Sequence, residues 1–421
     1  MNKPLITPYG IFIVVVLIFL QFTVILDFMV LSPLGAMLLE EFDITAAQFG
    51  ILVSAYAWSA GISGLFSAGF ADKFDRKKLL LFFYTGFIIG TALCGIATDY
   101  TFLLAARIIT GIFGGVIGSV IYAIVTDLFV IQIRGSVMGF LQMAFAGASV
   151  LGLPAGLYLA SFFGWHIPFL LIAGLCVFVL LLIIVFMKPV NAHLANSTLR
   201  NPAEHLARTI SNPSYAKAFA TTLLLATGGF MLMPFGSVFA VQNNGISMSD
   251  LPQLYFITGV CSMCAAPLIG VLSDIVGKYV VFCICSVVLI VSTVIYCNLG
   301  ITPVAVVTVF SAFMFTSYAG RMVSSSALIT AVPEALDRGA FMSINSAVNM
   351  ISGGIASLIA GAIVFQSEDG RIRNYDILGY VVAGATVVTI AMLYLIDKMV
   401  KQKQLTKASL VETPNEVEPI R

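Results

Sequence analysis

Long apolar runs without a charge recur along the whole chain and restrict the folds that it can adopt. A run of about 20 apolar residues crosses a bilayer as an α-helix. Of the 421 residues, 60% are hydrophobic and 10% are charged, and a soluble domain of this size cannot bury so much apolar surface. The pattern predicts an all-α integral membrane protein with twelve transmembrane helices. The expected spans are residues 9–39, 47–70, 79–98, 101–128, 136–161, 165–187, 215–241, 248–272, 279–298, 302–330, 340–365 and 375–396.

One connecting segment, residues 188–214, is long and polar, whereas most other loops are short. It divides the spans into two sets of six, each of which is expected to form a helix bundle. The predicted organisation is a first bundle at 1–187, a linker at 188–214, a second bundle at 215–397 and a disordered tail at 398–421.

The loops differ sharply in their content of Lys and Arg, which sets the orientation of a membrane protein. If the N-terminus lies inside, the inner loops and the tail contain nearly all of these residues, and only Arg371 and Arg373 fall in outer loops. We therefore expect both termini, the linker and the tail to lie in the cytoplasm.

The two halves share short sequences at matching places. "GFADKFDRKKLL" at 69–80, with six charges, follows the second span, and "GVLSDIVGKYVV" at 270–281 follows the second span of the other half. "RGSVMG" at 134–139 likewise matches "RGAFMS" at 338–343. A repeat of about 200 residues indicates two similar bundles, and paired bundles in a membrane favour a transporter with its site between them.

The charged loop resembles the G-x-L-x-D-x-x-G-R-K/R signature of the major facilitator superfamily. Asp72, Arg76 and Lys77 match that signature, and Asp75 stands where the family usually has glycine. The resemblance extends from residue 9 to residue 397. The first half is similar to bacterial drug-efflux and arabinose-efflux proton antiporters in residues 26–61, 103–115 and 150–169. The fifth span does not contain the exact antiporter signature, but it has the same small and kink-forming residues, namely Gly147, Gly152, Pro154 and Gly156.

This resemblance implies that the loop acts as a gating latch, formed by Gly69, Asp72, Arg76, Lys77 and Asp127. Asp72 would lie near the positive N-terminal end of the eleventh helix, and Arg76 would pair with Asp127 at the inner end of the fourth. Both contacts would hold the inner face closed in the outward-open state. The alternative is a solvated basic loop that only fixes topology.

Three ionisable residues, Asp27, Arg107 and Arg321, fall well inside spans, where charge is expensive and usually functional. A carboxylate removed from water holds a proton more readily, so we expect Asp27 to bind the coupling proton. If Arg107 approaches Asp27 it opposes protonation, and movement between them would switch proton affinity. Related efflux proteins often carry an acid and an arginine at these two points. The alternative is a permanent structural ion pair.

Polar, aromatic and methionine side chains within spans are candidates for the substrate cavity. Arg321 is expected either to contact an anionic substrate group or to pair with Glu334 or a backbone carbonyl. Pro234 predicts a kink beside Phe230 and Met233, whose side chains suit varied apolar ligands. Packing alone is the alternative for each. The predicted substrate-binding set is Gln21, Tyr56, Gln142, Phe230, Met233, Arg321, Asn345 and Asn349.

The sequence and the resemblance together indicate a secondary active transporter that exports a drug, sugar or related metabolite by proton antiport and alternating access. A symporter or uniporter that imports a sugar or organic acid is the nearest alternative, and a non-transporting receptor is another. Without a P-loop, HExxH or GxSxG motif, we expect no enzyme and no ATPase. The CxxC of Cys261 and Cys264 has no second ligand pair, so we expect no metal and no cofactor. The expected partners are a small-molecule substrate, protons and the lipid of a bacterial inner membrane, with no nucleic acid, and the protein is expected to be a monomer.

The latch hypothesis predicts that Asp72→Asn abolishes transport and leaves folding and membrane insertion normal, because it removes the charge without changing side-chain size. Transport by the variant, compared with its amount in the membrane, checks this. Unchanged transport would show that the loop serves only to fix the orientation of the protein in the membrane.

Overall fold

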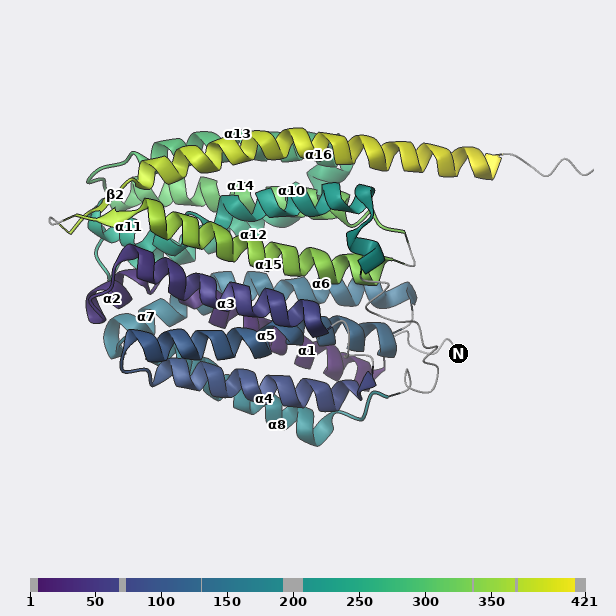
Figure 1. Cartoon of the computed structure of the whole chain (residues 1–421), viewed down its shortest axis with the longest axis horizontal. Helices are drawn as coiled ribbons and strands as arrows, with labels where there is room; N and C mark the ends of the chain where they lie inside the picture. The colour runs from purple at the N-terminus through teal and green to yellow at the C-terminus, as the bar shows by residue number, and fades with distance from the viewer. Residues whose placement is uncertain are drawn as a thin grey trace, which may run out of the picture.

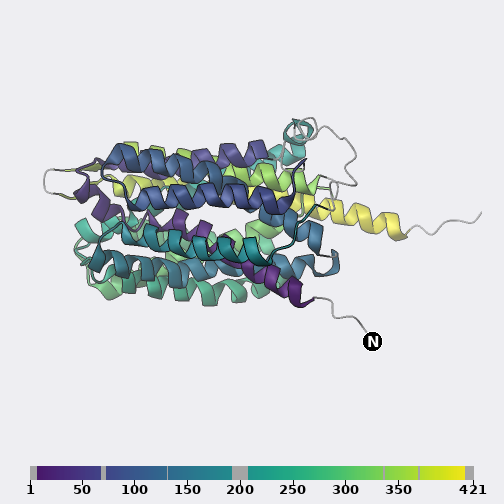
Figure 2. The ribbon, with the colours of Figure 1, turned by 90° about the horizontal axis from the view of Figure 1, so that it is seen from below.

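The computed structural model describes residues 7–67, 73–129, 131–191, 207–334, 337–367 and 370–412. The chain forms two helical bundles that lie side by side, with all long helices along the long axis of the molecule (Figures 1 and 2). Twelve helices in this described part are long and apolar enough to cross a membrane. The predicted fold class, an all-α membrane protein of two six-helix bundles, is confirmed.

The first bundle contains the helices up to Phe186. They are α1 (Pro8–Val30), α2 (Gly35–Glu41), α3 (Ala46–Ser67), α4 (Arg76–Gly95), α5 (Tyr100–Leu128), α6 (Ile131–Gly147), the π-helix η2 (Ala148–Gly152), α7 (Leu153–Phe163) and α8 (Ile167–Phe186).

The second bundle repeats this order and adds a short hairpin. Its elements are α10 (Pro213–Phe230), the 3₁₀-helix η4 (Met233–Phe235), α11 (Gly236–Gln242), α12 (Leu251–Val276), α13 (Lys278–Cys297), α14 (Val304–Ile329), α15 (Arg338–Ile363), β1 (Phe365–Gln366), β2 (Ile372–Arg373) and α16 (Tyr375–Glu412). The strands pair antiparallel, with Phe365 opposite Arg373.

Helix starts follow ordinary capping chemistry. The side chains of Thr7, Asp75, Asp99 and Asn212 accept hydrogen bonds from backbone amides in the first turns of α1, α4, α5 and α10. Such caps satisfy amides that have no partner within the helix. Asp75, which departs from the family signature, is thus the N-cap of α4.

Two spans are interrupted at prolines. The span predicted at 9–39 is two helices, because α1 ends at Val30 and α2 begins at Gly35 after a turn that contains Pro33. The seventh span breaks in the same way around Pro234, where η4 separates α10 from α11, so the predicted kink is confirmed. Proline cannot donate the backbone hydrogen bond that a continuous helix needs.

The predicted disordered tail is wrong for residues 398–412, because α16 continues to Glu412 and extends past the bundle (Figure 1). The Asp397–Lys401 ion pair supports this extension, at 2.6 Å and i,i+4 spacing. Lys403 Nζ also donates to the backbone oxygen of Val332 at 3.0 Å. Residues 413–421 lie outside the described part.

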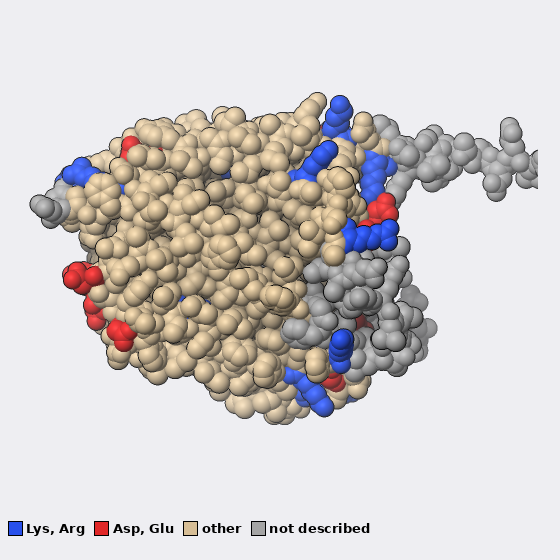
Figure 3. Space-filling view, viewed as in Figure 1, with Lys and Arg blue, Asp and Glu red and all other residues tan. Residues whose placement is uncertain are grey.

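The charges gather at the two ends of the bundle and leave a broad uncharged band between them (Figure 3). We call the end with Arg76, Lys77 and Lys278 the basic end, and the end with Glu40 and Glu41 the acidic end. The distribution agrees with the Lys and Arg bias of the loops.

Contacts join the two bundles at the acidic end. Ser237 Oγ donates to the backbone oxygen of Ser32 at 3.0 Å, and the rings of Phe49 and Phe235 lie 5.9 Å apart. Glycines let α3 and α15 approach closely, since a Cβ on Gly50 would lie only 2.9 Å from the backbone oxygen of Ser357.

Gly50→Ala is expected to destabilise this arrangement by about 1–3 kcal/mol, because the added methyl meets rigid backbone. The thermal unfolding midpoint of the purified protein measures this. Gly174→Ala is the matched control, because no atom of the described chain lies within 4 Å of its Cβ position. Equal midpoints for the two variants would show that the interface tolerates the methyl.

Candidate functional site

A buried ion pair joins the first and fourth spans. Arg107 Nη1 on α5 donates to Asp27 Oδ2 on α1 at 2.9 Å, and the two side chains are 1% and 0% exposed. The same nitrogen lies 3.3 Å from the backbone oxygen of Asp27. Thr91 Oγ1 of α4 donates to the other carboxylate oxygen at 3.1 Å. Both oxygens of the buried carboxylate are therefore hydrogen-bonded, as a charge at this depth requires.

Glycines on α5 allow the helices around the pair to pack closely. A Cβ on Gly111 would lie 2.6 Å from the backbone oxygen of Tyr56, and one on Gly114 would lie 2.6 Å from the Tyr56 hydroxyl. A Cβ on Gly90 of α4 would lie 2.8 Å from the amide of Thr110. Small residues at these crossings bring α3 and α4 against α5 and enclose Arg107.

Tyr56 of α3 completes the environment of the arginine. The guanidinium carbon of Arg107 lies 4.6 Å from the centre of the Tyr56 ring and 6.0 Å from that of Phe169. A desolvated cation over an aromatic face gains about 2 kcal/mol. Arg107 Nε is buried and has no hydrogen-bond partner within the described chain. The cation is therefore held by one carboxylate and by aromatic faces.

A row of three aromatic rings connects this site to the second bundle. Phe28, next to Asp27, lies 5.3 Å from Tyr56 and 5.7 Å from Phe230, measured between ring centres. Phe230 is the last residue of α10, and its backbone oxygen accepts from Ser357 Oγ at 3.1 Å. The ion pair of the first bundle is thereby in packed contact with the broken span of the second.

Burial and Arg107 have opposite effects on proton binding by Asp27. Complete burial disfavours the charged carboxylate of Asp27, whereas Arg107 and the Thr91 hydroxyl favour it. A change in the Arg107 contact would therefore change the affinity of Asp27 for a proton.

The other predicted cavity residues are more dispersed. Gln21 on α1 and Asn349 on α15 are half-buried, and Met233 lies in η4 and packs against the core. Asn345 Oδ1 accepts from Thr222 Oγ1 at 2.6 Å, which ties α15 to α10. The side chain of Gln142 lies outside the described residues.

Arg321 is buried inside the second bundle and does not join the Asp27 site. Its guanidinium lies over Phe282 of α13 at 5.1 Å and donates to Thr386 Oγ1 of α16 at 3.4 Å. The predicted alternative of pairing with Glu334 is wrong, because Glu334 is exposed at the basic end and no ion pair between the two occurs in the described chain.

One of the two contacts predicted for the charged loop, between Arg76 and Asp127, is present. Arg76 Nε donates to Asp127 Oδ2 at 3.0 Å, and the Arg76 amide donates to the backbone oxygen of Val190 at 3.0 Å. Lys77 Nζ donates to the backbone oxygen of Ile184 at 3.0 Å, at the end of α8. Gly69 and Asp72 lie outside the described residues, so the contact of Asp72 with α15 stays a prediction.

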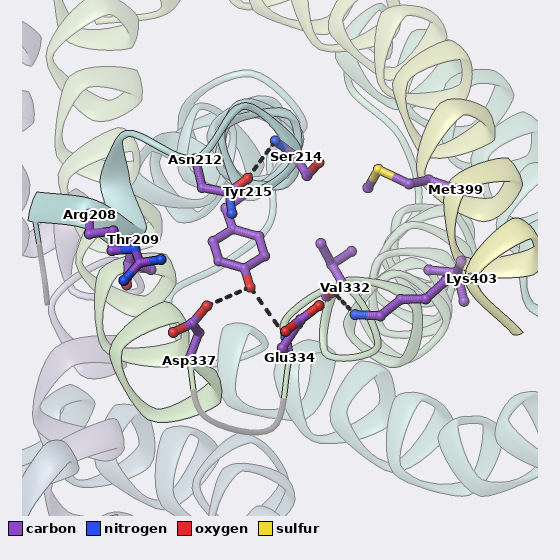
Figure 4. A pocket seen from close by; sticks show the side chains of 11 residues that line it. Arg208, Thr209, Asn212, Ser214, Tyr215, Val332, Glu334, Asp337, Met399 and Lys403 are labelled. Carbon is purple, nitrogen blue, oxygen red and sulfur yellow. Dashed lines mark hydrogen bonds between the residues drawn. The ribbon is translucent and has the colours of Figure 1, made fainter. Parts of the chain in front are cut away.

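A pocket of about 450 Å³ at the basic end of the second bundle escaped the sequence analysis (Figure 4). Tyr215 donates to Asp337 Oδ2 at 2.9 Å, and its hydroxyl accepts from the Glu334 amide at 3.3 Å. Lys403 of α16 closes one side through its bond to Val332. The start of α10, the loop before α15 and the extension of α16 are thus tied together.

Sequence reasoning also missed Thr91 and Phe28. Thr91 is a hydroxyl in the apolar third span, and a polar residue at that depth is the signal that could have identified it. Phe28 carries no such signal, because one ring among 33 phenylalanines is indistinguishable from packing without the structure.

Comparisons with known proteins agree on the family and the fold. The sequence profile of the Major Facilitator Superfamily matches residues 17–216 and again residues 218–417. The uncharacterized MFS-type transporter YceJ of Bacillus subtilis (strain 168) is 27% identical over 266 residues, 62% of this chain and 66% of that protein. A probable sugar efflux transporter of Mannheimia succiniciproducens is 24% identical over 268 residues, 64% of this chain and 66% of that protein. The match thus spans just under two thirds of each relative. A crystal structure of a D-xylose-proton symporter has the same fold, with a TM-score of 0.73 at 16% identity over 90% of this chain and 97% of that one.

The buried pair predicts non-additive mutations. Arg107→Gln is expected to cost about 3–5 kcal/mol of stability, because it leaves the Asp27 carboxylate buried without its cation. Adding Asp27→Asn should recover much of this loss, since the double variant buries no unpaired charge. Thermal unfolding of the wild type, both single variants and the double variant forms the cycle. Losses that simply add would show that the two groups do not interact energetically.

Proposed function

The chain belongs to the Major Facilitator Superfamily, and we propose that it is a secondary active transporter that exports a small organic molecule by proton antiport. The observation that carries this proposal is the buried Asp27–Arg107 pair and its aromatic connection to the second bundle. An intramembrane carboxylate with a single cationic partner is more typical of a proton relay than of a purely structural core.

The proposed coupling acts through the contacts around Asp27. Protonation neutralises the carboxylate and weakens its hold on Arg107, which lies over Tyr56. A shift of Tyr56 acts on Phe28 and through it on Phe230, at the break in the seventh span. Because rigid bundles rock against each other in such transporters, a small shift at this contact between bundles would alter the balance between open states.

The arrangement of contacts at the two ends supports alternating access. At the acidic end the bundles are joined by Ser32 with Ser237 and by Phe49 with Phe235, and we propose that this end is closed in the structure. We propose that the basic end faces the cytoplasm of a bacterial inner membrane, that both termini lie there, and that the protein works as a monomer. The Arg76–Asp127 pair would hold α4 and α5 as one unit, while Asp72 would reach α15 in the opposite state.

The substrate is proposed to bind between the bundles beside Phe230, Met233 and Asn349. Aromatic, methionine and amide side chains there suit a molecule with both apolar and hydroxyl-bearing faces. The name of the Mannheimia succiniciproducens relative, a probable sugar efflux transporter, supports a sugar or related metabolite. Drug-like molecules belong in the same substrate panel, because methionine and aromatic surfaces accept varied ligands.

Proton-coupled import is the second candidate. It is favoured by the likeness to the D-xylose-proton symporter, which shares the fold and, as a symporter, moves its substrate and a proton in the same direction. The buried pair serves either direction, because fold and proton site do not by themselves set the direction of transport.

Proteoliposomes with an internal pH dye test the proposal. Addition of drugs, sugars and organic acids under an imposed gradient should trigger proton flux with wild-type protein. Asp27→Asn, which cannot exchange a proton, should lower this flux to the level of protein-free liposomes. Asp99→Asn is the matched control, because asparagine also caps a helix and Asp99 lies outside the buried site. Flux opposite to substrate movement supports antiport, and flux in the same direction supports the symporter. Equal substrate-triggered flux in Asp27→Asn and wild type would make the pair purely structural.

A further inference from the structure

Arg321 is a buried cation without a carboxylate partner. Its side chain is 2% exposed, its Nε has no hydrogen-bond partner, and its Nη1 makes one long bond of 3.4 Å to Thr386. Throughout the described ranges, no Asp or Glu lies within ion-pair distance of it. A desolvated guanidinium costs several kcal/mol unless an opposite charge or several good acceptors surround it. The second bundle therefore contains a positive charge that its own described side chains do not balance.

The internal repeat identifies the position in the second bundle that corresponds to Asp27, the carboxylate that pairs with the buried arginine of the first bundle. When Pro33 is aligned with Pro234, Leu31 and Gly35 also match Leu232 and Gly236. The structure supports this register, because α2 and α11 begin at the two matched glycines. In the same register, the position of Asp27 in the first bundle is taken by Gly228 in the second.

Gly228 lies directly beside the unbalanced cation. A Cβ added to Gly228 would lie 3.4 Å from Arg321 Nη1, and no other non-neighbouring atom of the described chain comes within 4 Å of that position. In the first bundle, the matching side chain is the carboxylate that holds Arg107. In the same register Arg107 corresponds to Thr308, so Arg321 reaches this position from a different place on the fourth helix of its bundle. The second bundle thus has a cation beside the matching position but supplies no acid there.

Further donors near Arg321 are also without partners. Ser324 lies one helical turn after Arg321 on α14, and its buried hydroxyl has no hydrogen-bond partner within the described chain. The hydroxyl of Ser286 on α13 is also buried without a partner in the described chain, and Ser286 lies one helical turn after Phe282, whose ring faces the Arg321 guanidinium. Hydroxyl donors around a guanidinium are the groups that bind a small anion.

We propose that Arg321 and Gly228 form a binding site for a small monovalent anion, either a halide or a carboxylate group, inside the second bundle. The anion would occupy the position that the Asp27 side chain fills in the first bundle and would neutralise Arg321. This site is independent of the direction of transport and of proton coupling at Asp27.

Thermal unfolding of purified full-length protein tests the site without a transport assay. Sodium chloride or sodium acetate is titrated at constant ionic strength against sodium HEPES, whose anion is too large for a buried site. The wild-type midpoint should rise saturably by about 2 °C or more, as expected for a ligand that binds only the folded state. No saturable rise with either anion would overturn the proposal.

Variants at Gly228 separate anion binding from general salt effects. Gly228→Asp supplies an internal carboxylate, so its midpoint in HEPES should reach that of the anion-saturated wild type and should no longer respond to chloride or acetate. Gly228→Asn introduces a side chain of nearly the same size without a charge. It should therefore lose the response to chloride and acetate and unfold at a lower temperature than Gly228→Asp. A saturable response that persists in Gly228→Asp would contradict the assignment.

The two sources of the anion give different results. A response to chloride assigns a bound halide, whereas a response to acetate alone assigns the carboxylate group of an organic acid. Either result supports the site. Because binding is measured on the purified protein, a failure here is distinguishable from a failure of proton flux in Asp27→Asn.

Discussion

The ion pair between Asp27 and Arg107 is the interaction around which the first bundle is organised. Two charges removed from water are stable only when each is well compensated. The structure meets this demand with Thr91 on one side and the Tyr56 face on the other, and glycines of α5 provide the close packing that these contacts need. Any step that changes the charge of Asp27 must therefore alter contacts on α3, α4 and α5 together.

The two bundles treat their buried arginines differently. In the first, the arginine is paired with the carboxylate of Asp27, which loses its charge only when it binds a proton. In the second, Gly228 stands at the matching position, and the described side chains around Arg321 offer it no carboxylate. Each half contains a buried arginine, at different places of the repeat, but only the first half supplies an acid. We therefore propose that a proton acts on the first bundle and another negative group on the second.

Much of this arrangement could be predicted from the sequence, because membrane burial leaves strong signals. Uncharged runs define the spans, and a charge such as Asp27 or Arg107 within a run is conspicuous. The ring contacts through Phe28 could not be predicted, since aromatic residues at helical spacing face lipid, neighbours or a cavity with equal ease. The helical extension of α16 was missed because polar composition resembles disorder until the contact of Lys403 with Val332 is seen. The roles assigned to the site residues remain predictions.

At the basic end, different contacts hold the helices of each bundle together. These contacts affect how the two bundles can move. In the first, Arg76 pairs with Asp127, and Lys77 binds the carbonyl end of α8. In the second, the hydroxyl of Tyr215 joins α10 to the loop before α15. Both sets of contacts lie within a bundle, whereas packing of small residues such as Gly50 joins the bundles to each other. Ion pairs and hydrogen bonds within the bundles, together with close and largely apolar contacts between them, favour rocking of two rigid units. The row of rings from Tyr56 to Phe230 crosses that boundary beside Asp27. We therefore propose that the charge state of Asp27 acts on the motion of the bundles through these rings.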